Sequence, residues 1–291
     1  MAGGKNGERQ RHRYDALMKK IAIAASVGTA LAIMGLVAPA AAWAAAPAAQ
    51  VFVAVKTPEA IDAEWRAHLC ALLPQPCDAR ALKLHRPRGG GAADDYVVLS
   101  EKPLAMAWLK RNPATNAWQL ERLHDFSSYA AALQRERKSD DPEANFSLAA
   151  ALYPLSEGRW AVAVTLQESE SYSGGGASYV TADFVPLDTP PGKPIKAVYS
   201  DIPYWCSQSI RACFSEKEYE TSKHCHDESR GSLRIAYDEP SKAGAPYVWR
   251  YTWLQSVWPA NTGPASNKRT SVSFTNDSPK AVDFCGGGLQ R

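Results

Sequence analysis

Six cysteines constrain the fold of this chain more than any other feature, and none of them falls within the first 69 residues. An even number of cysteines in an exported protein indicates disulfide bonds. Cys70 and Cys77 lie across the end of a predicted helix, so we expect a local bridge between them. The other four allow three pairings. The pairing that we expect is Cys206 with Cys213 and Cys225 with Cys285.

The N-terminal region has the pattern of a signal peptide. Met18-Lys19-Lys20 precedes Ile21 to Val37, which carries no charge, and Ala42-Trp43-Ala44 supplies the small residues that a signal peptidase requires. We therefore expect residues 1–44 to be a signal peptide that is cleaved after Ala44, with Met18 as an alternative start. An uncleaved anchor is the rival interpretation, because the charge-free run is long enough to cross about 30 Å of hydrocarbon.

The leader also accounts for the basic character of the chain. Residues 1–20 hold six Lys/Arg and two Asp/Glu, a net charge of +4, whereas the whole chain carries +3, so the remainder carries −1. This near-neutral remainder has no basic stripe interleaved with aromatic residues, which argues against nucleic acid as a partner. Export and cysteine usage together predict a periplasmic or secreted protein without a stable membrane span after cleavage.

Hydrophobic periodicity predicts an α+β fold that is predominantly antiparallel β. One helix is expected to begin at Thr57-Pro58-Glu59 and to bury Ile61, Trp65, Leu69 and Leu72, and a second is expected over residues 127–137. Alternation at period two, with glycine-rich turns, predicts a sheet of meanders and hairpins. The predicted strands cover residues 51–55, 96–100, 104–110, 117–123, 146–155, 160–170, 178–187, 197–205, 232–237, 247–258 and 270–274.

A proline-rich stretch is the best candidate for a domain boundary. Residues 189–194, "TPPGKP", contain three prolines and one glycine, residues that interrupt regular structure. We therefore expect an α+β domain over residues 45–188, a linker at 189–194, and a smaller disulfide-bonded β domain over residues 195–291.

The stretch "HCHDE" is a candidate metal site. A strand there would place His224, His226 and Glu228 on one face, and two imidazoles with a carboxylate could hold zinc or copper. The spacing matches no recognised ligand signature, and Cys225 is expected to be oxidised in this compartment. We therefore expect no cofactor and a disulfide-anchored turn here, with a metal site as the alternative.

A second candidate site is a row of alternating aromatic residues. Tyr247, Trp249, Tyr251 and Trp253 are spaced to face the same way along one strand. An exposed row of rings could stack on sugars or bind an apolar patch of a partner. The competing interpretation, which we favour, is that the row is the core side of a half-buried sheet, since aromatic residues bury large areas.

Catalytic motifs are missing from the sequence. There is no G-x-S-x-G elbow, no H-E-x-x-H, no C-x-x-C and no phosphate-binding glycine loop. We expect an exported, non-catalytic periplasmic binding protein whose partner is a protein or polysaccharide of the cell envelope. An inhibitor or immunity-type protein of a cell-envelope enzyme fits this profile. The alternatives are a carbohydrate-binding accessory protein and a metal-dependent hydrolase that uses "HCHDE".

Overall fold

The computed structural model describes residues 48–55, 62–73, 76–89, 95–115, 117–137, 145–190, 192–242, 244–276 and 278–286. By its contacts the chain divides into Met1–Ala44 and Ala45–Arg291, and every described residue belongs to the second unit. The expected signal peptide and its cleavage point therefore lie outside the described residues.

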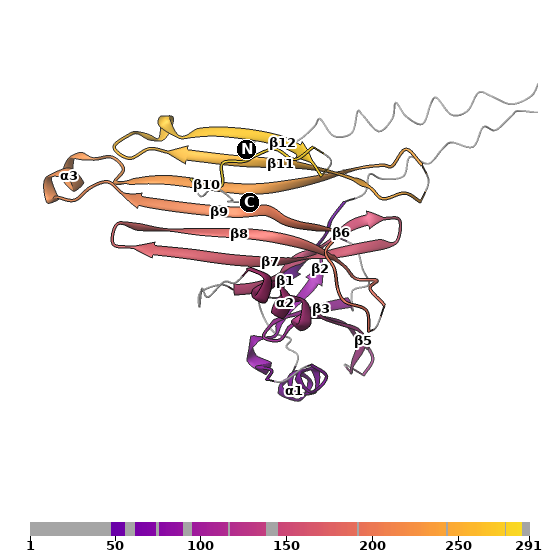
Figure 1. Ribbon diagram of the computed structural model, residues 1–291. Coiled ribbons are helices and arrows are strands. Elements are labelled where there is room, and N and C mark those ends of the chain that lie inside the picture. Colours follow the sequence, from indigo (N-terminus) through magenta and orange to yellow (C-terminus); the bar gives the residue numbers. More distant parts are fainter. Residues whose placement is uncertain are drawn as a thin grey trace, which may run out of the picture. The chain divides into compact units, whose positions relative to one another are not determined.

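Twelve strands in the described part of the chain form one antiparallel sheet (Figure 1). From β6 onward the strands pair in the order in which they occur in the chain, as a meander does, whereas β1 lies between β6 and β2. The order across the sheet is β12-β11-β10-β9-β8-β7-β6-β1-β2-β3-β4-β5. The strands are β1 (Gln50–Ala54), β2 (Lys83–Pro87), β3 (Asp95–Glu101), β4 (Leu104–Arg111), β5 (Trp118–Asp125), β6 (Asn145–Ser156), β7 (Arg159–Tyr172), β8 (Gly175–Pro186), β9 (Tyr199–Arg211), β10 (His226–Asp238), β11 (Val248–Trp258) and β12 (Lys268–Thr275).

Few helices accompany this sheet, so the predicted fold class is confirmed: α+β, predominantly antiparallel β. The α-helices in the described residues are α1 (Ala63–Ala71), α2 (Ser127–Arg137) and α3 (Glu216–Thr221). Short 3-10 turns occur at Ala79–Ala81 and Pro264–Ser266. Across the described ranges, none of these helices has the length and apolar character needed to cross a bilayer.

Helix α1 begins later than the sequence suggested. Its N-cap is Asp62, whose carboxylate accepts a hydrogen bond from the Trp65 N–H (2.8 Å); the proposed start at residues 57–59, like Ile61, lies outside the described residues. Leu69 is buried as expected, but Leu72 is exposed and Leu73 is buried in its place. The reason is that Leu73, four residues after Leu69, lies on the same side of the helix as Leu69, whereas Leu72, the C-cap residue, lies beside that side.

Tight turns join the long strands where the sequence placed them. Glu157 and Gly158 connect β6 to β7, and the positive φ of Gly158 (+70°) is one that glycine adopts without steric penalty. The β4–β5 hairpin closes through Asn112, whose side-chain oxygen accepts hydrogen bonds from the N–H groups of Ala114 and Thr115. These local turns explain why neighbours in sequence are neighbours in the sheet.

The proposed linker joins two strands that are hydrogen-bonded neighbours. Residues 189–194 lie between β8 and β9, and these strands pair from Gly175↔Ile210 to Phe184↔Tyr199. One cluster of buried residues contains Phe184 on one side of this segment and Trp249 on the other. The sheet and this part of the core therefore continue across residues 189–194.

Three disulfides are present, and two of the three expected pairings were wrong. Cys70 bonds Cys77 as expected. Cys206 bonds Cys285 because the C-terminal segment returns over the buried side of β9, where Phe284 packs in the core. The remaining two cysteines flank the β9–β10 connection, and backbone pairing from the Ala212 N–H to the Cys225 carbonyl (2.8 Å) brings them opposite each other. The third bond is therefore Cys213–Cys225.

Gly231 is a point of close packing that the sequence did not reveal. A Cβ at this position would overlap the Trp253 ring and lie 2.8 Å from the Cys206 sulfur. We expect Gly231→Ala to lower the free energy of unfolding by about 2–3 kcal/mol, because neither neighbour has room to move. Denaturant unfolding measures this. Gly263→Ala, where a Cβ meets open space, is the matched control and should change stability by less than about 0.5 kcal/mol; equal effects would contradict the packing.

Candidate functional site

The aromatic row considered as a ligand site lies in the core. Trp249, Tyr251 and Trp253 are each at most 1% exposed, and Tyr247 packs against the same cluster. The Trp249 indole N–H donates to the Pro154 carbonyl oxygen (2.9 Å). The three fully buried rings therefore present no free face on which a sugar could stack.

The members of "HCHDE" are engaged in structural contacts. Cys225 is in a disulfide, and the His224 ring stacks on the Trp258 indole with centroids 3.7 Å apart and planes 7° from parallel. His226 begins β10, opposite Arg211 of β9. Its imidazole lies 6.5 Å from that of His224, measured between ring centroids.

The third proposed metal ligand also has a partner. The Glu228 carboxylate accepts a hydrogen bond from the Arg230 guanidinium at 3.3 Å. Within the described ranges, no group of three or more His, Cys, Asp or Glu side chains is arranged to hold a metal ion. The zinc or copper hypothesis therefore gains no support from these residues.

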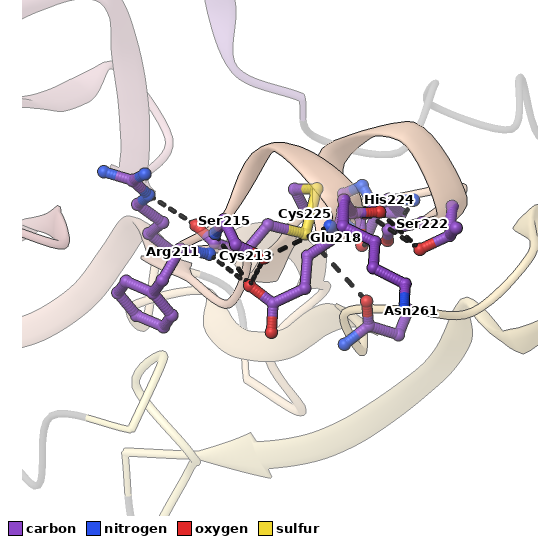
Figure 2. The surroundings of a disulfide bond; sticks show 11 residues. Arg211, Cys213, Ser215, Glu218, Ser222, His224, Cys225 and Asn261 are labelled. Carbon is purple, nitrogen blue, oxygen red and sulfur yellow. Dashed lines mark hydrogen bonds between the residues drawn. A yellow bond between two sulfur atoms is a disulfide. The ribbon is translucent and has the colours of Figure 1, made fainter.

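The connection between β9 and β10 contains a short helix and a disulfide, and we call residues 212–225 the tip loop. It lies at one end of the sheet and contains helix α3 (Figure 1). The Cys213–Cys225 disulfide closes its base, with α3 between the two cysteines (Figure 2). A covalent closure of this kind limits the conformations open to the loop.

A capping box fixes the start of α3. The N-cap Ser215 accepts a hydrogen bond at Oγ from the Glu218 N–H, and the Glu218 carboxylate accepts from the N–H groups of Phe214 and Ser215, both at 2.8 Å (Figure 2). These hydrogen bonds, led by that from Phe214, lower the pKa of the Glu218 carboxyl below its usual value. The ionised Glu218 carboxylate accepts hydrogen bonds and cannot donate them. It is therefore the form that binds these N–H groups and stabilises the loop.

Neighbouring loops hold the tip loop in place. The Asn261 N–H, from the β11–β12 connection, donates to the His224 carbonyl at 2.7 Å. The same connection binds β10, since the Ala260 N–H donates to the Asp227 carboxylate at 2.7 Å. On the other side, the backbone N–H of Arg211 donates to the carbonyl of Gly174 in the β7–β8 turn. The β11–β12 connection thus contacts the tip loop directly at His224, and the other two hydrogen bonds fix the ends of the two strands from which the loop extends.

Two aromatic rings project from this anchored loop. Phe214 is 70% exposed, the largest value among the exposed large hydrophobic residues in the described part of the chain, and Tyr219 is 47% exposed. The Arg211 guanidinium lies over both rings, 5.3 Å from the Phe214 centroid and 5.5 Å from that of Tyr219. The Nε–H of Arg211 also donates to the Cys213 carbonyl at 2.6 Å, which fixes the guanidinium beside the disulfide.

Further apolar side chains are exposed at the same end of the sheet. Tyr172 of β7 and Ile210 of β9 lie in one row across neighbouring strands, because each is directly opposite Gly175 of β8. Val257 lies at the end of β11. Each of these three residues is about two-fifths exposed. Exposed apolar side chains that gather at one end of a molecule are typical of protein-interaction sites.

Two large cavities among the described residues offer no catalytic set of side chains. One, of about 790 Å³, borders α2; its only ionisable lining residues are Glu101, which pairs with Lys83, and Lys102. The other, of about 640 Å³, lies beside β12 and is lined mostly by apolar residues with Lys280. Neither is lined by a histidine or a cysteine, so neither pairs a nucleophile with an imidazole base.

One local sequence pattern indicates the helix of the tip loop. Ser215 followed three residues later by Glu218 is the pattern of a capping box, and it predicts a helix start. No local sequence pattern predicts that Phe214 is exposed, because the burial of a side chain depends on whether distant parts of the chain pack over it.

No protein-family model matches this chain, and no curated protein or solved structure matches it at a significant level. Function must therefore be inferred from the side chains themselves.

Proposed function

We propose that this protein is an exported periplasmic binding protein that docks on a protein of the cell envelope through the tip loop, without covalent chemistry. The observation that carries the proposal is the 70% exposure of Phe214 in a loop that a disulfide and a capping box hold in shape. Aromatic anchors supply much of the energy of protein interfaces, and a rigid loop loses little entropy on binding. An inhibitor or immunity-type protein would use such a loop to fill an apolar pocket of an enzyme.

Export is part of the same proposal. The disulfides among the described residues are compatible with an oxidising compartment. The leader pattern in residues 1–44 supports passage across the inner membrane. A partner that resides in the cell envelope would then be within reach of the tip loop.

Photo-crosslinking can identify the partner. A benzophenone amino acid placed at position 214 should form an adduct with one specific envelope protein, because the side chain there projects outward. Leu72, the C-cap residue of α1, is the matched control position, since it is also a large exposed apolar residue but lies outside the tip loop. Adducts at position 72 and none at position 214 would contradict the proposal.

The affinity of the identified partner should depend on the Phe214 ring. We expect Phe214→Ala to weaken binding about 30-fold, as loss of an interface anchor worth about 2 kcal/mol would. The melting temperature should not change, because an exposed side chain contributes little to folding. Titration calorimetry of the purified pair measures the change, with Leu72→Ala as the control. Wild-type affinity in the Phe214→Ala variant would remove the tip loop as the docking element.

A further inference from the structure

The solvent-facing side of β10, β11 and β12 carries a group of arginines that lie outside the tip loop. In antiparallel strands, residues directly opposite each other share a face. Arg230 and Arg269 both lie opposite Ser256, and Arg250 alternates along β11 with the buried Trp249 and Tyr251. We call this group the arginine face; its members are Arg230 and Arg234 of β10, Arg250 of β11 and Arg269 of β12.

The arginine face has an excess of positive charge. Arg230 pairs with Glu228 at 3.3 Å, and Arg250 pairs with Asp238 at 2.9 Å. Arg234 and Arg269 are exposed and form no ion pair with any residue of the described ranges. Residues 45–291 carry a net charge of −1, so this concentration of cations does not follow from composition. A charge distribution of this kind attracts anions.

Hydroxyl groups and one exposed indole share the face with the arginines. Trp205 of β9 is exposed and lies opposite Ser232, which in turn lies opposite Leu254. The hydroxyl side chains that the strand register places on this face are Ser207, Ser232, Thr252, Ser256, Ser271 and Ser273. Neighbouring strands are about 4.8 Å apart, so these groups repeat across the sheet at a short, regular interval.

We infer that the arginine face binds an anionic polysaccharide, with carboxylates of the glycan on Arg234 and Arg269. Guanidinium groups bind carboxylates through paired, charge-assisted hydrogen bonds. Serine and threonine hydroxyls both donate and accept, as the hydroxyls of a sugar require. Trp205 provides a ring on which a sugar can stack. An extended chain running across β9 to β12 would meet all three kinds of group in turn.

A bilayer surface fits these side chains less well. Interfacial binding needs several apolar side chains that enter the acyl region together. On this face the exposed apolar side chains Trp205 and Val248 belong to different strands and different cross-strand rows, and Leu254, in the same row as Trp205, is only partly exposed. Anionic vesicles therefore serve as a competing probe in the test.

The test compares alginate, a linear polymer of uronates, with neutral dextran and with phosphatidylglycerol vesicles. We expect the protein to bind alginate, to bind dextran weakly or not at all, and to lose alginate affinity as salt rises. Arg234→Gln with Arg269→Gln should weaken alginate binding at least tenfold. Arg122→Gln with Arg135→Gln removes the same charge from β5 and α2 and should change it less than twofold.

The outcomes separate this inference from the tip-loop proposal. Phe214→Ala should bind alginate as the wild type does, since the two surfaces are distinct, and Trp205→Ala should bind it at least threefold more weakly. Absence of alginate binding, equal losses in the two arginine double variants, or stronger binding to the vesicles than to alginate would each overturn the inference.

Discussion

Replacing Trp249 with alanine is expected to lower the free energy of unfolding by about 4–5 kcal/mol, near the upper end for a core tryptophan. The ring contacts five other aromatic residues, and its N–H donates to the buried carbonyl of Pro154. The substitution therefore opens a cavity and leaves a carbonyl without its donor. Denaturant unfolding followed by circular dichroism measures the loss.

Two variants keep this prediction falsifiable if the alanine variant does not fold. Trp249→Phe retains an aromatic ring but lacks the donor, and we expect a loss of about 2 kcal/mol. Val248→Ala changes the adjacent, exposed side chain on the opposite face of β11 and should alter stability by less than about 0.5 kcal/mol. If Val248→Ala were as destabilising as Trp249→Phe, the strand would face the other way.

Removing the Cys206–Cys285 disulfide should have an effect of similar size. The bond joins residues 79 positions apart, and opening a loop of that length lowers stability by about 4 kcal/mol in the chain-entropy model. Cys206→Ala with Cys285→Ala should therefore unfold at a much lower denaturant concentration than the wild type. Release of the C-terminal segment should also expose Trp253, because its indole N–H donates to the Asp283 carbonyl in that segment.

The tip-loop disulfide provides the comparison. Cys213 and Cys225 are 12 positions apart, so Cys213→Ala with Cys225→Ala should lower stability by about 3 kcal/mol and leave the core tryptophans protected. Tryptophan fluorescence during unfolding distinguishes the two double variants. A greater loss of stability and of tryptophan burial in the Cys213/Cys225 variant would contradict the role of the C-terminal segment.

Local patterns predicted much of the sheet. Alternation from Val248 to Trp258 predicted strand β11 and placed its large aromatic rings on one face. Turn residues such as Gly158 marked the reversals, because their preferences depend only on adjacent backbone. Strand β2 was not predicted because Leu84 is the one aliphatic side chain in its sequence KLHRP, so the segment shows no period-two alternation of apolar and polar residues.

Non-local features could not be predicted. The partner of Cys206 depends on where the C-terminal segment returns, and no pattern near either cysteine records that path. For the same reason a row of rings such as Trp249 to Trp253 predicts one face but not whether that face is covered. Phe214 was overlooked because it lies outside any periodic element.

The proposed docking element is a tip loop that is closed by its own disulfide and presents Phe214. Disulfide mapping by mass spectrometry of protein purified from the periplasm without reduction tests this claim most directly. The structure predicts linked peptides that contain Cys213 with Cys225 and Cys206 with Cys285. Peptides that link Cys206 to Cys213 and Cys225 to Cys285 would contradict it, because α3 would then lie outside any short covalent loop and Phe214 would lose the support that makes it a preformed anchor.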